Sequence, residues 1–187
     1  MSELTVLRKQ AHDYASPQPQ PMRPHGWRIT PTPPPPEEFY LMGQVSAAST
    51  ILIDAEPATV LTAIADYQGV RPKILSPQYS QYQVLQGGQG QGTVAKWKLQ
   101  ATKSRSREVQ AVVDVAGHTV IEKDANSSMV INWTVSPAGP GSSVTVKTTW
   151  TGAGGIGGFF EKTFAPLGLR RIQDEVLANL KKVVESK

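Results

Sequence analysis

The chain of 187 residues contains no cysteine, only three histidines, and 18% charged residues. Without cysteine it has no disulfide bond, thiolate metal ligand or cysteine nucleophile, and we expect a cytoplasmic location. His12 and His25 lie in a proline-rich start and His118 in an expected turn, so no metal-ligand spacing occurs. No GxSxG motif accompanies the serines. The sequence therefore predicts no metal, no cofactor and no residue with an assigned catalytic role.

Long hydrophobic runs are also missing. No stretch reaches the ~18 apolar residues that a membrane span needs, and Met1–Gln10 lacks the apolar core of a signal peptide. The net charge is only +4, and residues 1–42 hold four charges of each sign, so the excess lies in the remainder. We expect no DNA partner and no stable membrane insertion, although a mildly basic domain allows transient contact with a membrane surface.

Residues 1–42 differ in composition from the rest of the chain. They hold most of the 15 prolines and show no sustained apolar periodicity. Such a segment buries too little apolar surface to offset its ordering entropy, which predicts a disordered or polyproline-II extension. It reads either as an inert tail or as a PxxP-type peptide ligand. Met42 stands where the folded pattern begins and is a candidate native start, and residues 43–187 form the expected domain.

The domain begins with a strand and a helix. Alternating apolar residues predict a strand over 44–53, and Glu56-Pro57 predicts the start of a helix that Gly69 ends. A short turn follows over 70–75. Six further strands joined by hairpin-like links are expected over 79–85, 93–102, 105–116, 119–124, 129–136 and 143–151.

A glycine-rich run leads into a long amphipathic segment over 152–187. Its second half carries an apolar stripe from Leu169 to Val183, and its first half carries a separate one with Ile156, Phe160, Phe164 and Leu167. Because Pro166 separates the stripes, we expect the helix to bend or restart there. The first part then acts either as a mobile lid or as a plug at the end of the core.

The expected inner face of the sheet alternates large rings with small residues. Trp97, Trp133 and Trp150 stand among alanines and Thr148, which indicates a cavity beneath the terminal helix, unless the tryptophans fill it. The predicted ligand-lining residues are Tyr67, Trp97, Leu99, Ala111, Val113, Met129, Trp133, Thr148, Trp150, Phe160, Phe164 and Leu167.

The order of elements is specific for a fold. Together with Ser49–Pro57, Ala65-Asp66-Tyr67 and Phe159–Leu169, it resembles the polyketide cyclase/dehydrase and lipid-transport branch of the START-like (SRPBCC) superfamily, which includes the birch pollen allergen. The resemblance covers residues 43–187. It implies an α+β helix-grip fold, with a seven-stranded curved antiparallel sheet wrapped on a long C-terminal helix. It also implies a hydrophobic small-molecule ligand such as a lipid, quinone or polyketide.

Three functions remain open at this point. The leading hypothesis is a carrier or sensor of a hydrophobic molecule, and the second is a polyketide cyclase or aromatase. For the second, Glu122, Asp114 or Tyr67 are candidate acid–base groups, but acids on such strands more often face water. The third is a ribosome- or protein-associated module, based on Lys96, Lys98, Lys103, Arg105 and Arg107. The sequence GAGGIG at 152–157 matches GxGxxG, but no second parallel strand follows it, so nucleotide binding is not expected.

Overall fold

The computed structural model describes residues 43–102, 105–152 and 156–186, except for the side chains of 101, 102, 105 and 156–165. The strands are β1 (Gln44–Ile53), β2 (Tyr79–Gln86), β3 (Val94–Thr102), β4 (Arg105–Ala116), β5 (Thr119–Asp124), β6 (Val130–Ala138) and β7 (Gly141–Thr151). The helices are α2 (Pro57–Ala65), α3 (Arg71–Ile74) and α4 (Ile156–Glu185). The proline-rich extension expected over 1–42 lies outside the described residues.

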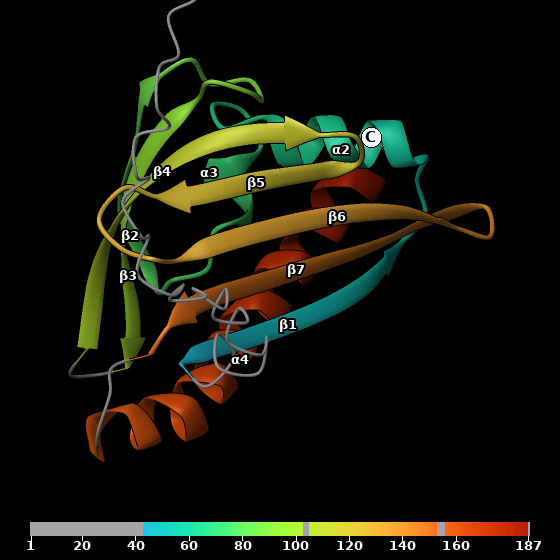
Figure 1. Ribbon diagram of the computed structural model, residues 1–187. Helices are drawn as coiled ribbons and strands as arrows, with labels where there is room; N and C mark the ends of the chain where they lie inside the picture. The colour runs from blue at the N-terminus through green and yellow to red at the C-terminus, as the bar shows by residue number, and fades with distance from the viewer. Residues whose placement is uncertain (1–42, 103–104, 153–155, 187) are drawn as a thin grey trace, which may run out of the picture. The chain divides into compact units, whose positions relative to one another are not determined.

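The strands form one antiparallel sheet in the order β1-β7-β6-β5-β4-β3-β2. Strands β2 to β7 follow one another as a meander, and β1 closes the far edge by pairing with β7, where Val45 lies opposite Trp150. Figure 1 shows β2 and β3 turned away from the direction of β1 and β7, so the sheet is strongly curved. The expected α+β fold with a seven-stranded curved sheet and a C-terminal helix is confirmed.

The hydrophobic core lies on the inner face of this sheet. The alternation read from the sequence holds in β1, β3, β6 and β7, where every second side chain is buried. Because successive residues of a strand point to opposite faces, one buried face accounts for this period of two. Helices α2 and α4 cover the buried face, with Val60 and Ile64 of α2 and Ile172, Val176 and Leu180 of α4 among the core residues.

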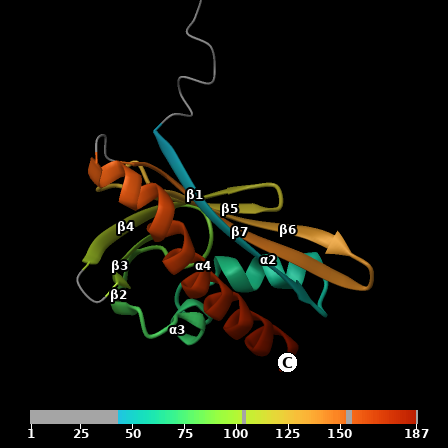
Figure 2. The ribbon, with the colours of Figure 1, turned by 90° about the horizontal axis from the view of Figure 1, so that it is seen from below.

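Helix α4 runs without interruption from Ile156 to Glu185, with Pro166 inside it. The restart expected near Pro166 is therefore not present, and Gly157 and Gly158 belong to the helix rather than to a loop. Figure 2 shows α4 crossing the sheet, with its last turns beyond α3. Buried residues on every third or fourth position keep one side of its second half against the sheet, which is sufficient to hold a helix through an unfavourable proline.

Helix α2 ends earlier than the sequence indicated. It stops at Ala65, and Asp66 rather than Gly69 is the C-cap. The Asp66 carboxylate Oδ1 accepts a hydrogen bond from the backbone N–H of Gly69 at 2.8 Å, which turns the chain into α3. In the described part of the chain, no helix has the length and apolar character needed to cross a membrane.

Candidate functional site

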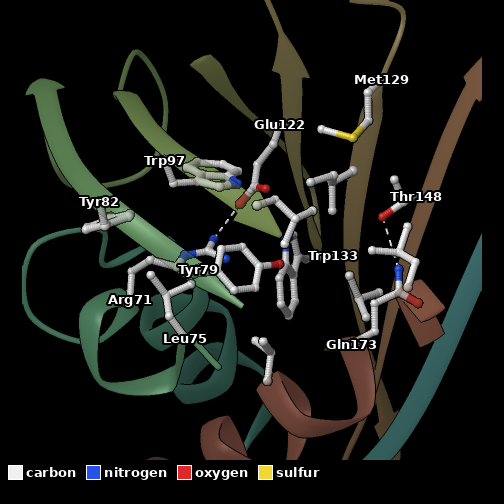
Figure 3. A pocket seen from close by; sticks show the side chains of 15 residues that line it. Arg71, Leu75, Tyr79, Tyr82, Trp97, Glu122, Met129, Trp133, Thr148 and Gln173 are labelled. Carbon is white, nitrogen blue, oxygen red and sulfur yellow. Dashed lines mark hydrogen bonds and ion pairs between the residues drawn. The ribbon is translucent and has the colours of Figure 1, made fainter. Parts of the chain in front are cut away.

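A small cavity lies between the inner face of the sheet, α3 and α4 (Figure 3). Its volume of about 20 Å³ accommodates one or two water molecules and no organic ligand. Among the residues whose side chains are described, aromatic rings and Arg71 surround this small cavity, and they leave no large void of the kind expected from the alternation of rings and small residues. The cavity is lined by Arg71, Leu75, Tyr79, Tyr82, Trp97, Leu99, Glu122, Met129, Ile131, Trp133, Val146, Thr148, Leu169, Gln173 and Val176.

A buried ion pair forms the polar part of this lining. Arg71 Nη2 lies 2.6 Å from Glu122 Oε1, and both residues are almost fully buried. The Tyr67 hydroxyl donates to the same Glu122 oxygen at 2.6 Å. The second carboxylate oxygen, Oε2, takes part in neither contact. Two donors thus converge on one oxygen, which fixes the orientation of the carboxylate inside a mostly apolar wall.

Aromatic rings hold the Arg71 guanidinium from two sides. Its central carbon lies 4.4 Å from the centroid of the Tyr67 ring and 4.9 Å from that of Trp133. Within such distances a cation is attracted by the ring face, and the attraction is stronger where water is excluded. Arg71 Nη2 also donates to the Ile64 carbonyl at 3.3 Å. A guanidinium placed in this way stays charged. Burial acts to lower the pKa of Arg71, but the Glu122 carboxylate outweighs it and the net shift is upward.

The turn after α2 places Tyr67 against Glu122. The Tyr67 N–H donates to the Gly88 carbonyl at 2.9 Å, and Gly90 N–H donates to Ala65 at 2.9 Å, so the β2–β3 link clamps the end of α2. Gly88 has a φ of +127°, a conformation that a residue with a side chain rarely adopts. Gln89 Nε2 also donates to Asp66 at 2.7 Å. Backbone and Gln89 hydrogen bonds lower the pKa of Asp66 against the opposing effect of its burial.

Three tyrosines near the cavity have raised pKa values. Burial, and then the negative charge of Glu122, raise the pKa of Tyr67 and of Tyr79 well above the ordinary value of 10. Burial raises the pKa of Tyr82 to about 12. The phenols therefore remain protonated at neutral pH and act here as hydrogen-bond donors, as Tyr67 does to Glu122 and Tyr82 does to the Tyr67 carbonyl at 2.6 Å.

The residues predicted to line the ligand site fall into four groups. Trp97, Leu99, Met129, Trp133 and Thr148 line the cavity. Tyr67, Ala111, Val113 and Trp150 are buried in the core without lining it. Leu167 is 58% exposed and is not part of the lining, because it lies on the solvent side of α4. The side chains of Phe160 and Phe164 lie outside the described residues.

Sequence reasoning missed most of the polar and helix-derived lining. Glu122 was expected to face water, yet it is 2% exposed. The signal was present, since Val120, Glu122 and Asp124 alternate on one face of β5 and all three are buried. Asp114 is only half-buried, and its Oδ1 accepts from the Val115 N–H at 2.8 Å. Arg71, Tyr79, Tyr82 and Gln173 carried no comparable signal, because their positions depend on how α3, β2 and α4 meet.

The basic residues singled out in the sequence are only partly described. Lys96 and Arg107 are exposed and Lys98 is half-buried, whereas Lys103 and the Arg105 side chain lie outside the described residues. A ribosome- or protein-binding role for them stays a prediction. No group of three or more histidine, aspartate or glutamate residues able to hold a metal ion occurs in the described ranges.

Comparisons with known proteins agree on the fold. A sequence-family model described as polyketide cyclase / dehydrase and lipid transport matches residues 44–185. The solution structure of the KanY protein (ms6282) is 81% identical, with a TM-score of 0.72 over 77% of this chain and 99% of that one. A search of curated proteins gave no match.

Two more distant structures share the fold alone. Ara h 8.0201 is 17% identical, with a TM-score of 0.56 over 78% of this chain and all of that one. The di-domain ARO/CYC protein BexL from the BE-7585A biosynthetic pathway is 16% identical, with a TM-score of 0.62 over 77% of this chain and 51% of that one.

Proposed function

Because the chain belongs to the polyketide cyclase/dehydrase and lipid-transport family, we propose that it carries or senses one hydrophobic small molecule. The molecule would lie between the inner face of the sheet and α4. The observation that supports this proposal is the composition of the cavity wall, which is mostly apolar and aromatic with two fixed polar pairs, Arg71 with Glu122 and Gln173 with Thr148. Binding sites for small molecules combine these two features, since apolar area provides affinity and a few polar groups provide orientation.

Binding requires the cavity to enlarge. Leu75, Tyr79, Tyr82 and Leu169 are the lining residues that remain partly exposed, so the wall between the cavity and solvent is thinnest there. They come from the segment after α3, from β2 and from α4. Displacement of α3 or of the edge strand β2 away from α4 would open the cavity. The pairing among the consecutive strands β3, β4, β5, β6 and β7 would stay intact. Ligand-dependent opening of this kind is a shift toward a minor conformation of the free protein.

A cyclase or aromatase is the second candidate, and the buried Glu122 favours it. A ring-forming condensation needs a base to take a proton from carbon next to a carbonyl, and a donor for the oxygen of the attacked carbonyl. Glu122 Oε2 would take the proton and return it to the new alkoxide, and Arg71 would stabilise the negative charge in between. Against this, Arg71 and Tyr67 already donate to Glu122 Oε1 at 2.6 Å each, so the carboxylate and its two donors are engaged with one another before a substrate enters.

Native mass spectrometry of the full chain purified from its own host tests the carrier proposal. We expect a fraction of the protein to carry one co-purified apolar molecule that organic extraction removes. Extracted protein should then bind 8-anilinonaphthalene-1-sulfonate with one site per chain. A chain that carries no guest and binds no dye would contradict the proposal and favour a ribosome- or protein-binding module.

The cyclase candidate makes a different prediction. The protein should accelerate the ring closure of a linear polyketone that cyclises to an aromatic product. The Glu122→Gln variant should lose this acceleration while it still binds the dye. Unchanged ring closure in Glu122→Gln would rule out the assigned role of the carboxylate. Tight dye binding without any acceleration would leave the carrier function.

A further inference from the structure

Three N–H donors around the cavity have no hydrogen-bond partner among the described residues: Arg71 Nε, Trp97 Nε1 and Trp133 Nε1. The three residues are 4–5% exposed, so bulk solvent does not reach these donors and only a molecule inside the cavity can pair with them. A buried polar group without a partner is costly, and buried polar groups in native proteins are nearly always paired. Gln173 Oε1, an acceptor on the same lining, also has no partner among the described residues, as do Ser76 Oγ and Gln78 Oε1 outside the lining. What sets the three donors apart is that they line one cavity together.

The three donors come from different elements that face one cavity. Arg71 is on α3, Trp97 on β3 and Trp133 on β6, and all three line the cavity. Figure 3 shows the Trp97 indole nitrogen on the side of the ring that faces Glu122, above the Arg71 guanidinium. The Trp133 ring lies on the other side, 4.9 Å from the guanidinium carbon. A group that enters the cavity therefore meets a wall to which all three donor residues contribute, together with Tyr79.

Charge decides which group fits. Arg71 and Glu122 neutralise each other at 2.6 Å, so the cluster has no net positive charge to offset an anion. Its one engaged acceptor, Glu122 Oε1, is already occupied by Tyr67 and Arg71. The cluster thus offers N–H donors to a neutral acceptor, and a carboxylate would also meet repulsion from Glu122.

We propose that Trp97 and Trp133 select a neutral ligand with a carbonyl oxygen, which accepts hydrogen bonds from their indole N–H groups. This inference rests on the proposed binding function and specifies its ligand class. A ketone or quinone on an apolar body matches the lining: the body lies against Leu99, Ile131 and Val146, and its oxygen points to the indoles. Hydrocarbon of the same shape would leave the donors unpaired, and a site built to bond an oxygen rejects such an analogue strongly.

The test compares three probes of nearly equal shape on the ¹⁵N-labelled full chain. 2-Acetylnaphthalene carries the carbonyl, 2-isopropenylnaphthalene replaces it by carbon, and 2-naphthoate replaces it by a charged group. We expect the ketone to bind at least about tenfold more tightly than either analogue, as expected for one to two good hydrogen bonds. The indole N–H resonances of Trp97 and Trp133 should move downfield with the ketone and not with the hydrocarbon.

Variants assign the effect to the two indoles. Trp97→Phe and Trp133→Phe each remove one donor and should reduce the preference for the ketone over the hydrocarbon. Trp150→Phe is the matched control, because Trp150 is equally buried but lies outside the cavity lining. If a variant fails to fold, the indole shifts of the unmodified chain still decide the question.

The outcomes separate this inference from the proposed function. Ketone and hydrocarbon binding with equal affinity, and indole resonances that do not move, would overturn the carbonyl site while leaving a hydrophobic carrier. In that case water satisfies the donors. Tighter binding of 2-naphthoate would also overturn it. Failure of all three probes to bind would overturn the carbonyl site together with the carrier function.

Discussion

The ion pair between Arg71 and Glu122 is the most unusual pair of side chains in the described domain. Burying two charges is expensive, and their attraction compensates only when geometry and further hydrogen bonds are good. Here Tyr67 supplies one such bond and the Tyr67 and Trp133 rings cover the guanidinium. An apolar pair of the same volume would often be as stable, so stability alone does not explain these residues, which is consistent with a role in the site.

Removing the charge of Glu122 leaves Arg71 buried and uncompensated. We expect Glu122→Gln to lower the free energy of unfolding by about 3–5 kcal/mol. Urea denaturation measured by tryptophan fluorescence gives the value. Glu108→Gln on the exposed face of β4 is the control and should change it by less than about 0.5 kcal/mol. A loss below 1 kcal/mol in Glu122→Gln would mean that water reaches Arg71.

The tyrosines near the cavity make stability fall at alkaline pH. The pKa of Tyr82 rises from 10 in the unfolded chain to about 12 in the folded one. Between these values the unfolded chain has lost the phenolic proton and the folded chain keeps it, so the free energy of unfolding decreases as pH rises. Tyr82→Phe should make the decrease between pH 10 and 11 less steep. Equal slopes in both proteins, from urea titrations at fixed pH, would refute the assignment.

Helix α4 combines two halves with different support. Its second half buries Ile172, Val176, Leu177 and Leu180 and is tied to the sheet by Gln173, whose Nε2 donates to Thr148 at 3.0 Å. At its far end Asn179 Nδ2 donates to the Ile74 carbonyl of α3 at 3.2 Å. Pro166 stands between these anchors and the start of the helix and lacks the N–H that a regular helix uses. We therefore expect local unfolding of α4 to begin in its first turns.

Replacing Pro166 tests this expectation. Pro166→Ala restores one helical hydrogen bond and removes the clash of the proline ring, which together favour the helix by up to about 3 kcal/mol. Hydrogen exchange followed by mass spectrometry should show slower exchange over residues 156–170 and no change over 172–184. Slower exchange along the whole helix would mean that α4 opens as a single unit.

The family match covers residues 44–185, and the helices and strands of the whole domain run over the same range, from Gln44 to Glu185. The single sheet and its covering helices form one hydrophobic core, and each strand and helix contributes buried or partly buried residues to it. The cavity between the sheet, α3 and α4 measures only about 20 Å³. Ligand binding by the whole domain is thus a question of how easily α3, β2 and α4 separate.

The composition of residues 1–42 predicts that they add nothing to the stability of this core. A chain beginning at Met42 should have a midpoint of thermal unfolding within about 1 °C of the full chain, since no buried surface is lost. Differential scanning calorimetry of both chains measures it. A decrease of more than about 3 °C would show that the proline-rich segment packs on the domain.

The sequence alone was sufficient for the order of elements, the sheet and its buried face. Strand residues such as Ala95, Trp97 and Leu99 alternate with polar ones, and this pattern depends only on the period of a strand. The helical stripe from Leu169 onward is equally local. Such patterns can be read from the sequence because each lies within a few consecutive residues and fits only one choice of buried face.

The cavity and its polar cluster were decided by tertiary structure. Arg71 on α3 and Tyr67 after α2 both meet Glu122 on β5, which lies 51 and 55 residues further along the chain, and no spacing predicts these contacts. The volume left between the tryptophans depends on how close α4 approaches the sheet, which is a property of packing and not of pattern. A charged side chain is tolerated in the core only where a partner of opposite charge contacts it. The partner of Glu122 lies on another element, and for that reason the pattern of β5 alone predicted that Glu122 faces solvent.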